Sequence, residues 1–343
     1  MLNNEAKLNS KIFDRDVELV PIRNGYGDGL VIAGERDKNV VVLCADLKES
    51  TRSHLFAEKF PERFFELGVA EQNMAAVASG LGISGKIPFM SSYAAFSPGR
   101  NWEQIRTTIS YNDANVKIAG SHAGISVGPD GATHQAVEDI AITRVMANMT
   151  VIVPCDSNEA EKATEAAVKI WGPVYIRLAR EKTPVVTTKE TPFTPGRAEV
   201  FWDSSIHSTS SGQARRARLK PEVAIIACGT LVHSALVAAK ELEDEGIGTI
   251  VVNNHTVKPM DEDTILRVAK KTGAVVSVEE HQIAGGMGSA VAEVLAKKHP
   301  TLQEFVGLQG VFGESGPPDK LLKKYGMDVA DIKRAVKKAK KRK

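Results

Sequence analysis

Short apolar runs alternate with helical patterns along this sequence, and that alternation restricts the possible folds more than any other feature. The runs in the first half are largely apolar and rich in Val and Ile, which is typical of buried parallel strands joined by crossover helices. They lie at residues 39–46, 86–92, 115–121, 149–156 and 173–180. The pattern predicts an α/β fold on a mostly parallel sheet that helices cover on both faces.

A polar stretch then interrupts the alternation and indicates a domain boundary. Residues 187–220 contain TTKETPFTPG and the Ser- and Arg-rich SSIHSTSSGQARRARLKP, a composition typical of a linker or an exposed insertion. Because 343 residues suffice for two ordinary domains, we expect two, each a mostly parallel sheet flanked by helices. The alternation resumes at 222–229, 247–253 and 274–280. The expected ranges are 12–190 for the first domain, 191–220 for the linker and 221–343 for the second domain.

The charge balance gives no reason to expect nucleic acid or a membrane as a partner. Charged residues make up 25% of the chain and the formal net charge is +2. The N-terminal MLNNEAKLNSKIF lacks the apolar core of a signal peptide, and no run reaches the ~18–20 apolar residues of a membrane helix. We therefore expect a cytoplasmic protein. The C-terminal ADIKRAVKKAKKRK is expected to be a solvated amphipathic helix that frays into a basic tail.

The three cysteines give no sign of a metal or redox site. Cys44, Cys155 and Cys228 each end a β-rich run and lie far apart in the sequence. Since no metal or redox spacing links them, we expect buried reduced thiols, as in cytoplasmic proteins. A catalytic thiol is the less favoured interpretation.

The segment SHAGISVGPDGATHQAVED, residues 121–139, places two histidines and an aspartate in a glycine-rich loop between a strand and a helix. Open α/β sheets bind ligands in such loops, at the carboxyl ends of their strands. Singly, Asp130 has an explanation as a turn residue, and His122 and His134 as satisfied polar residues. Together they favour a site for a polar substrate, because imidazoles exchange protons with hydroxyls and carbonyls near neutral pH. No further His or Cys completes zinc-ligand spacing, so a metal site is not expected here.

Three arginines lie near other predicted strand or helix ends, where they could hold phosphate. Arg23 belongs to VPIRNGYG, and Arg177 and Arg180 belong to YIRLAR. A planar guanidinium binds two oxygens at once, although a single surface arginine means little. Strand alternation would place Arg177 and Arg180 on opposite faces, so at most one of them is expected to face a given ligand.

The stretch ELGVAEQNM, residues 66–74, places Glu71 at the start of a run of small and apolar residues, AAVASGLG. A helix dipole stabilises a first-turn glutamate by ~0.3–1 kcal/mol, which would by itself account for a surface residue. The small residues that follow instead indicate close helix packing, with a contact between subunits as one option. A carboxylate held there would lose water and tend to keep or share a proton, so Glu71 is a candidate partner for a ring nitrogen.

These motifs together resemble the transketolase family, and in particular the separately encoded C-terminal half of split transketolases. GVAEQNM is similar to the family's GVxE segment, ADLKEST to its ADLxxS, and SHAGISVGPDGATHQAVEDIA to its HDSIGxGxDGPTHQP. EEHQIAGGMGSAVAEVL and VFGESG resemble its C-terminal domain. The likeness runs in the family's order from about residue 12 to 335. It implies that residues 12–190 bind the pyrimidine ring of thiamine diphosphate and that 221–343 form the transketolase C-terminal domain.

The resemblance implies roles for individual residues around this cofactor. Glu71 matches the glutamate that bonds the pyrimidine ring and favours the imino tautomer, whose nitrogen deprotonates the thiazolium carbon; the cofactor then supplies the carbanion chemistry. Tyr93 and Phe96 match aromatic positions against which the ring packs, although ordinary core residues would look the same. Asp46 matches a residue near the cofactor and the subunit interface.

The resemblance also implies a set of residues that bind the sugar phosphate. His122 and His134 match histidines that contact donor hydroxyls and the carbonyl oxygen, which makes them catalytic candidates beside Glu71, and Asp130 matches an aspartate that reads a donor hydroxyl. Arg177 has no counterpart that we can assign. Departures at SHAG, Ala132 and Gly99 leave the donor specificity open. The matches for the phosphate-binding group are Arg23, Ser50 and Arg180.

Full-length family members contain a further domain that binds the cofactor's diphosphate. We expect that domain to lie on a separate chain. That domain carries GDG with an asparagine at a characteristic distance downstream. GDG occurs here at 27–29, but in a stretch that predicts a helix, and no asparagine lies between Asn39 and Asn73. The resemblance thus implies a partner subunit that holds the diphosphate and Mg²⁺, with self-association into a heterotetramer.

The expected reaction is transfer of a two-carbon ketol unit from a ketose phosphate to an aldose phosphate. Alternatives are a deoxyxylulose-phosphate synthase-like enzyme, a 2-oxoacid dehydrogenase beta subunit-like chain, or a non-catalytic regulatory subunit that uses the 203–220 insertion and the basic tail for binding. His122 with Asp130 favours a polyhydroxy donor over pyruvate. Retention of these two residues with Glu71 and His134 argues against a non-catalytic role.

Overall fold

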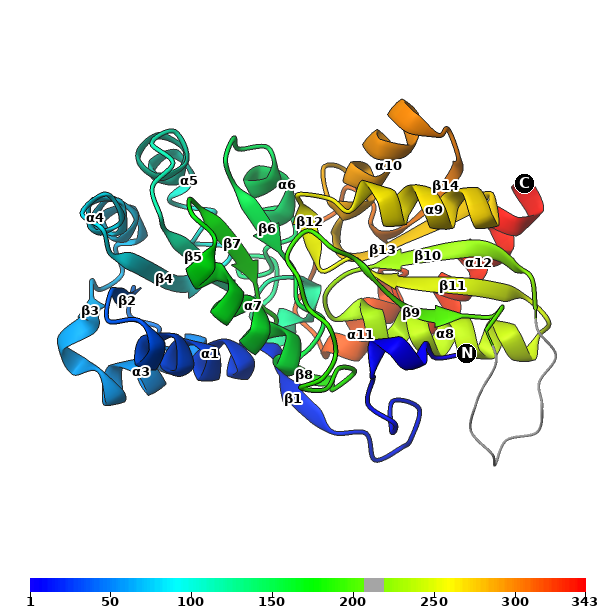
Figure 1. Ribbon diagram of the computed structural model, residues 1–343, viewed down its shortest axis with the longest axis horizontal. Coiled ribbons are helices and arrows are strands. Elements are labelled where there is room, and N and C mark those ends of the chain that lie inside the picture. The colour runs from blue at the N-terminus through cyan, green and yellow to red at the C-terminus, as the bar shows by residue number, and fades with distance from the viewer. Residues whose placement is uncertain (207–218) are drawn as a thin grey trace.

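The computed structural model describes residues 1–206 and 219–343, which form two sheets side by side, each flanked by helices (Figure 1). The expected α/β class with two mostly parallel sheets is confirmed. Most of the insertion expected at 203–220 lies outside the described residues. None of the described helices is long and apolar enough to cross a membrane.

The first sheet has seven strands in the order β12-β6-β7-β5-β4-β2-β3. All neighbours are parallel except β12, which runs antiparallel to β6 and comes from the second half of the chain. The central strands are buried along their length, as their apolar runs predict. The strands are β2 (Val40–Cys44), β3 (Phe64–Glu66), β4 (Ile87–Tyr93), β5 (Lys117–Ser121), β6 (Thr150–Ile152), β7 (Val174–Arg177) and β12 (Thr256–Lys258).

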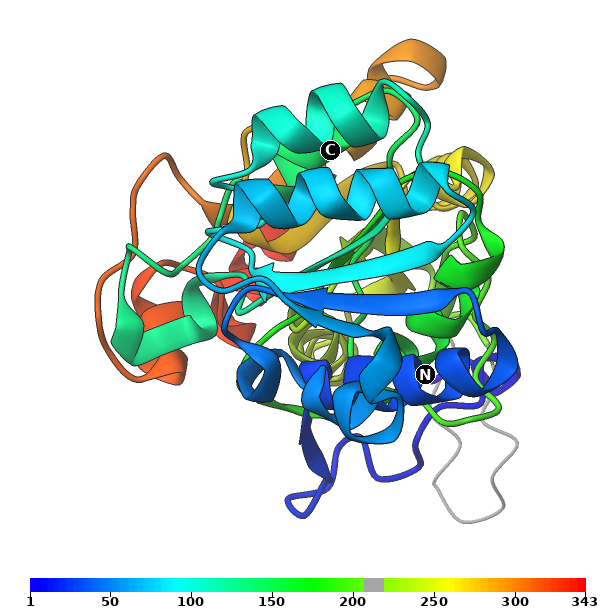
Figure 2. The same cartoon turned by 90° about the vertical axis from the view of Figure 1, so that its left-hand side faces the viewer.

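Helices cover both faces of this sheet. Figure 2 shows α4 with the segment α5–η3 on one face and α1 with α3 on the other. A short antiparallel ribbon of β1 (Leu19–Pro21) and β8 (Lys182–Pro184) precedes α1. The helices are η1 (Asn4–Ala6), α1 (Ile22–Arg36), α2 (Lys48–Thr51), α3 (His54–Lys59), η2 (Pro61–Arg63), α4 (Glu71–Ile83), α5 (Trp102–Gln104), η3 (Ile105–Ser110), η4 (Ile125–Asp130), α6 (Asp139–Arg144) and α7 (Ser157–Lys169).

The GDG sequence at 27–29 lies inside α1, where its glycines permit close helix packing. A Cβ added at Gly27 would lie 2.7 Å from the Cβ of Arg52, and one added at Gly29 would lie 2.7 Å from the Cβ of Thr164 in α7. Such distances leave no room for a methyl group. The motif therefore serves contacts between helices in this chain.

The second sheet has five strands in the order β14-β13-β10-β11-β9, parallel except for β9 against β11. β9 lies within the stretch expected to be a linker, so the structure differs from that expectation here: its register on β11 makes residues 199–203 part of the second sheet. The strands are β9 (Glu199–Asp203), β10 (Pro221–Ala227), β11 (Gly248–Asn253), β13 (Ala274–Gln282) and β14 (Leu302–Leu308). The helices are α8 (Leu231–Asp244), α9 (Glu262–Thr272), α10 (Met287–Lys298), α11 (Pro318–Lys324) and α12 (Val329–Arg342).

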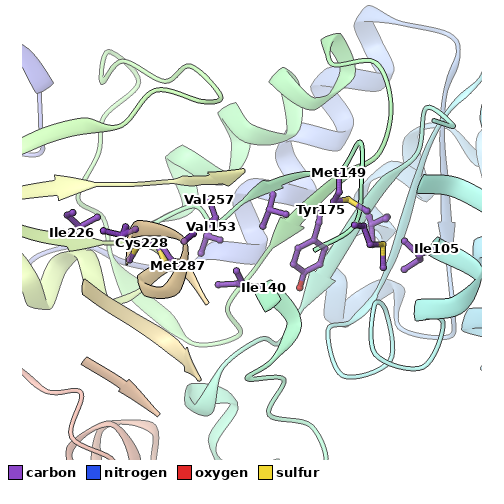
Figure 3. Packing of buried hydrophobic residues seen from close by; sticks show 14 of the residues in the cluster. Ile105, Ile140, Met149, Val153, Tyr175, Ile226, Cys228, Val257 and Met287 are labelled. Atoms are coloured by element: carbon purple, nitrogen blue, oxygen red, sulfur yellow. The ribbon is translucent and has the colours of Figure 1, made fainter. Parts of the chain in front are cut away.

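One hydrophobic core continues from the first sheet into the second. Figure 3 shows Tyr175 and Ile140 of the first sheet's side in the same buried cluster as Ile226, Cys228 and Met287 of the second. A shared apolar core opposes independent motion of the two domains, because separation would expose it to water.

The C-terminal basic helix differs from the expected fraying tail. Helix α12 continues to Arg342 and buries Ile332, Val336 and Ala339 against the second domain. Its cations are held by carboxylates of neighbouring elements, with Lys338 and Arg342 both paired to Glu304. Apolar contacts and ion pairs therefore hold the helix on the second domain.

Candidate active site

The candidate residues gather where the central strands of the first sheet end. Neighbouring strands β2, β4, β5 and β7 are parallel, so their carboxyl ends share one edge. Asp46 follows β2, Tyr93 ends β4, His122 follows β5 and Arg180 follows β7. Arg23 joins them from the first turn of α1.

His122 is a buried, neutral imidazole at the centre of this edge. Its ring stacks on Tyr93 with centroids 3.8 Å apart, and its backbone has a φ of +56°, rare for a residue with a side chain. Burial, together with the charges of Arg23 and Arg180, lowers the pKa of His122 to about 3. Arg23 Nη1 lies 3.3 Å from Nε2; since a guanidinium only donates, Nε2 accepts and Nδ1 donates to Ser121 Oγ at 2.9 Å.

An aromatic pair lies beneath both histidines. Tyr93 and Phe96 have nearly parallel rings with centroids 5.9 Å apart. His134 meets Phe96 edge-on at 5.4 Å and Tyr93 at 6.2 Å, while its Nδ1 contacts Thr133 Oγ1 at 2.9 Å. The loop 122–134 thus returns its second histidine to the same aromatic surface as the first.

Guanidinium groups make the α1 side of this edge positive. Burial and the nearby charges of Arg52 and Arg180 lower the pKa of Arg23. Arg23 Nη1 donates to the carbonyl of Ser50 at 2.8 Å, so Ser50 contributes its backbone to this contact. Arg180 Nη1 donates to the carbonyl of Val127 at 3.1 Å and to Glu181. No motif distinguishes Arg52, which the structure places beside α1, where its Nε donates to Asn24 Oδ1 at 2.8 Å.

Glu71 is buried at the start of α4, with 1% of its surface exposed. Ser92 Oγ donates to Oε1 at 3.2 Å, and Arg100 Nη1 donates to Oε2 at 2.6 Å. Neighbouring residues of a strand point to opposite faces. Since Glu71 contacts Ser92 and His122 stacks on Tyr93, the two side chains lie on opposite sides of the end of β4. Arg100 also lies over the Phe96 ring at 4.6 Å. Sequence reasoning missed Arg100, which lacks a strand end or a glycine-rich loop to mark it.

Asp46 and Asp130 lie at the exposed border of the group. The backbone N–H of Asp46 donates to Glu66 at 2.7 Å, and its φ is +60°. Asp130 ends η4 and is exposed. Among the described residues, neither carboxylate is hydrogen-bonded to the other candidate side chains. Their roles stay predictions.

Arg177 is separated from the site and belongs to the junction between the domains. Strand β7 ends at Arg177, so strand alternation does not extend to Arg180 and gives no basis for placing the two on opposite faces. Arg177 Nε donates to Asp139 at 2.8 Å, and both side chains are buried. Burial alone would raise the pKa of Asp139, but the Arg177 charge outweighs it and holds that pKa below its usual value.

Neither the cysteines nor any acidic cluster offers a second site among the described residues. Cys44, Cys155 and Cys228 are unpaired and buried, and burial raises the pKa of each thiol, which disfavours the reactive thiolate. In the described parts of the chain, no three His, Cys, Asp or Glu side chains lie close enough to hold a metal ion.

This geometry defines a class of protein: a two-domain α/β chain with a polar site at the carboxyl edge of its first sheet. Residues 19–185 match the family model of the transketolase pyrimidine binding domain, and residues 212–332 match that of the transketolase C-terminal domain. The chain belongs to the transketolase family.

The proteins similar to this chain include a C-terminal section and a subunit of transketolases. The putative transketolase C-terminal section of Methanocaldococcus jannaschii is 42% identical over 318 residues, which cover 92% of this chain and 95% of that protein. The 6-deoxy-6-sulfo-D-fructose transketolase subunit SqwH of Clostridium sp. is 39% identical over 314 residues, 92% of each chain. A solved split gene transketolase, described as an inactive beta4 tetramer, superposes with a TM-score of 0.84 at 45% identity and covers 94% of this chain and 99% of that one.

Proposed function

We propose that this chain is the C-terminal subunit of a thiamine diphosphate-dependent transketolase that acts with a separate diphosphate-binding subunit. The reaction is transfer of a two-carbon ketol unit from a ketose phosphate to an aldose phosphate. The observation that carries the proposal is the gathering of a buried carboxylate, an aromatic pair, two imidazoles and a guanidinium group at one sheet edge.

The residues at this edge fit the pyrimidine end of the cofactor. When bound, thiamine diphosphate supplies a nucleophilic thiazolium carbanion and an electron sink. The buried Glu71 carboxylate, beside Ser92 and Arg100, holds a proton at a pyrimidine ring nitrogen. Tyr93 and Phe96 supply a flat apolar surface for the same ring. Asp46, which follows β2 at the same edge, completes the cofactor side.

The remaining residues bind and orient the sugar phosphate. His122, kept neutral by burial, binds donor hydroxyls and the carbonyl oxygen when its ring nitrogens exchange their present contacts with Arg23 and Ser121 for the substrate. His134 faces it across the aromatic pair, and Asp130 reads a further hydroxyl. The phosphate binds to Arg23 and Arg180 at the α1 side of the edge, near Ser50.

A partner subunit supplies the diphosphate and Mg²⁺ sites in this proposal. The GDG sequence of this chain is committed to helix packing in α1, and the similar proteins include a C-terminal section and a split gene transketolase. We further propose a cytoplasmic heterotetramer in which copies of this chain also contact each other. Helix α4 supports that contact, because its outer face exposes Val77 at 36% and Ile83 at 65%.

One observation favours an alternative function, in which the enzyme uses the same cofactor but a different sugar substrate. The similar Clostridium subunit is named for 6-deoxy-6-sulfo-D-fructose, and a sulfonate would bind the arginines as a phosphate does. Parallel assays with ketose phosphates, a sulfonated ketose and pyruvate separate ketol transfer from pyruvate decarboxylation. Decarboxylation without ketol transfer would overturn the proposed reaction.

Titration calorimetry tests the shared site directly. Thiamine diphosphate and Mg²⁺ are titrated into this chain alone and then into a mixture with a GDG-bearing subunit, and binding is expected only in the mixture. Tight binding to the chain alone would contradict a site divided between two subunits. Absence of binding in a mixture that forms the complex would favour a non-catalytic subunit.

The substitution Glu71→Gln tests the mechanism in the reconstituted complex. Gln cannot hold a proton at a ring nitrogen as a carboxylate does, so we expect ketol transfer to fall by on the order of 10²–10⁴-fold. Arg36→Gln, on the exposed end of α1, is the control and should keep full activity. Full activity of Glu71→Gln would exclude the proposed role of this carboxylate.

A further inference from the structure

The loop between His122 and Ala136 has little regular structure to fix its shape. Gly124, Gly128 and Gly131 have φ values of +91°, +77° and +73°, and the short segment η4 is interrupted by a non-helical kink at Gly128. The two ends of the loop meet where Gly124 N–H donates to the carbonyl of Ala136 at 2.7 Å. Contacts from outside the loop must therefore define where His122, Asp130 and His134 lie.

A carboxylate of the second domain provides one of these contacts. Glu280 on β13 is 2% exposed, and its Oε1 accepts from the backbone N–H of Ser126 at 2.5 Å. Its Oε2 accepts from Thr230 Oγ1 at 2.6 Å, on the second domain. A Cβ added at Gly124 would lie 2.4 Å from Oε1, so the carboxylate packs directly on the loop backbone. One side chain thus joins the two domains at the loop.

Further contacts from the second domain surround the same loop. The segment between β14 and α11 approaches it from the other side, where Gly316 N–H donates to the carbonyl of Gly128 at 3.4 Å and Gln135 Nε2 donates to the carbonyl of Glu314 at 3.1 Å. These contacts use the backbone of the second domain, which substitution does not remove. Glu280 instead contacts the loop through its side chain, so a substitution within the second domain can delete this contact without changing the loop's own sequence.

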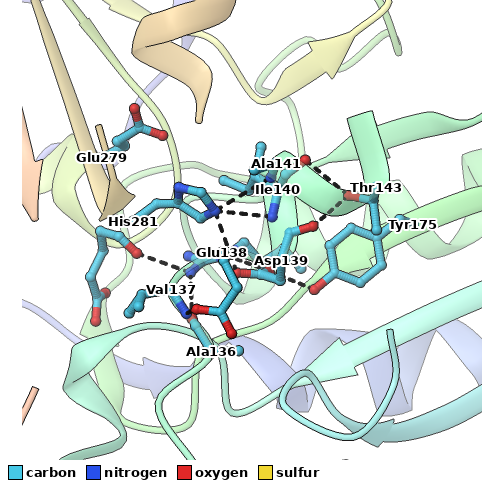
Figure 4. Close-up of polar contacts among 12 residues, drawn as sticks. Ala136, Val137, Glu138, Asp139, Ile140, Ala141, Thr143, Tyr175, Glu279 and His281 are labelled. Atoms are coloured by element: carbon cyan, nitrogen blue, oxygen red, sulfur yellow. Dashed lines mark hydrogen bonds and ion pairs between the residues drawn. The ribbon is translucent and has the colours of Figure 1, made fainter. Parts of the chain in front are cut away.

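The start of α6, which follows the loop, is also held from the second domain. His281 Nε2 accepts from the N–H groups of Ile140 and Ala141 at 3.2 and 3.4 Å, as Figure 4 shows. Burial lowers the pKa of His281 to about 4, so its imidazole stays neutral and able to accept. Arg177 Nη2 donates to the carbonyls of Ala136 and Glu280 at 3.3 and 2.9 Å. The loop is thus held at its middle and at its end.

We propose that Glu280 is a positioning residue that holds the loop 122–136 in the conformation that binds the sugar donor. The inference rests on the proposed function. It gives the second domain a role in donor binding through the loop backbone, although none of the candidate site residues belongs to that domain. It requires that loss of the Glu280 carboxylate alters the loop more than it alters the rest of the fold.

The chain offers a matched control in the preceding residue. Glu279 lies on the same strand, is also 2% exposed and also accepts backbone N–H groups, from Met287 at 2.6 Å and Gly288 at 2.8 Å. Those donors belong to α10, within the second domain. Substitution of Glu279 therefore removes an equally buried carboxylate without a contact to the loop.

The test compares Glu280→Ala, Glu280→Gln and Glu279→Ala. Hydrogen–deuterium exchange is measured in this chain, and KM for a ketose phosphate is measured in the reconstituted complex. For Glu280→Ala we expect faster exchange in residues 122–136, a donor KM raised on the order of tenfold to a hundredfold, and unchanged thiamine diphosphate affinity. Glu280→Gln keeps an oxygen that accepts from Ser126 and should restore both values. Glu279→Ala should change neither.

The outcomes separate this inference from the proposed function. If Glu280→Ala changes loop exchange and donor KM no more than Glu279→Ala does, the positioning role is wrong, although the transketolase proposal stands. If the wild-type complex transfers no ketol unit but Glu280→Ala still accelerates exchange in the loop, the proposed function fails and the role of Glu280 in holding the loop stands. Should Glu280→Ala not fold, Glu280→Asp withdraws the carboxylate by one methylene and should exchange faster in residues 122–136 than both the wild type and Glu279→Ala; exchange equal to theirs would overturn the positioning role.

Discussion

At the scale of single residues, the buried pair of Arg177 and Asp139 illustrates how one contact links distant parts of the chain. Arg177 ends β7, Asp139 begins α6, and Tyr175 Oη donates to the same carboxylate at 2.6 Å. Two buried charges lose their hydration, so their attraction and hydrogen bonds must compensate. Removing one charge is therefore expected to cost more than removing both.

The substitution Arg177→Met tests this expectation. It leaves Asp139 buried without a counter-ion, and we expect the free energy of unfolding to fall by ~3–5 kcal/mol. The double variant Arg177→Met with Asp139→Asn removes both charges and should be more stable than the single variant. Denaturant unfolding of the three proteins measures the difference. A double variant that is less stable than Arg177→Met would contradict the prediction.

At the scale of elements, glycines of helix α1 permit its close packing against α7 and α3. A Cβ added at Gly25 would lie 1.8 Å from the carbonyl oxygen of Ser157, at the start of α7. At Gly34, a Cβ would meet the Phe56 ring at 2.5 Å. Helix α1 therefore meets the backbone of α7 at Gly25, whereas at Gly34 it makes room for the Phe56 ring of α3.

Two Gly→Ala substitutions should have opposite effects on stability. Gly25→Ala places a methyl group against backbone and should lower the free energy of unfolding by at least ~1–3 kcal/mol. Gly80→Ala in α4 meets no atom of the same chain within 4 Å and should raise the free energy of unfolding of the single chain by ~0.4–1 kcal/mol, because alanine restricts the unfolded chain and favours the helix. Thermal unfolding of both variants provides the measurement. Equal shifts of the two midpoints would show that close packing of α1 is unimportant.

At the scale of the whole molecule, burial between the domains controls the titration of His255. Its side chain is fully buried, and its ring lies tilted by 33° against that of Phe193 with centroids 4.3 Å apart. The residue follows β11 near the domain junction. Burial lowers the pKa of His255 to about 3. In the unfolded chain its pKa returns to ~6.5, so between these values the unfolded state binds a proton that the folded state does not.

This difference predicts a pH dependence of stability. As the pH falls from ~6.5 towards ~4, the free energy of unfolding should decrease by up to ~1.4 kcal/mol per pH unit because of this one group. Above pH ~7.5 the group makes no contribution to the slope. The comparison is with His255→Phe, which keeps an aromatic ring and removes the titration, so other groups cancel. Parallel stability curves for the two proteins between pH 7 and 5 would refute the assignment.

The outer face of α4 is the other feature that belongs to the whole molecule. Val77 and Ile83 are exposed there, and Val69 before the helix is 71% exposed. Exposed apolar side chains are common in contact surfaces between proteins, so we expect this face to lie between copies of the chain.

Lysines on this face should disrupt self-association. The double variant Val77→Lys with Ile83→Lys places charges where apolar contact is expected, and sedimentation velocity should show smaller species than the wild type. Trp171→Lys is the control, because Trp171 is 69% exposed but lies outside this face. Unchanged sedimentation of the double variant would exclude α4 from the contact.

Much of the fold could be predicted from the sequence because burial leaves a local pattern. All eight expected runs contain strands, among them β2, β5 and β11, since a strand covered on both faces is apolar along its length. Short strands such as β3 and β12 were missed. They are too brief for periodicity, and β12 joins the first sheet only because the chain returns from the second domain to pair with β6.

For the candidate site, the sequence alone determined which residue types follow the strands and which family they resemble. Glycine-rich loops and strand ends mark Glu71, His122 and His134 through local spacing. Only the tertiary structure decided that Arg100 pairs with Glu71, that Arg177 belongs to the domain junction and that Glu280 reaches Ser126. These partners are separated by many residues, and a pairing between distant residues leaves no periodic signal, because it depends on the path of the whole chain.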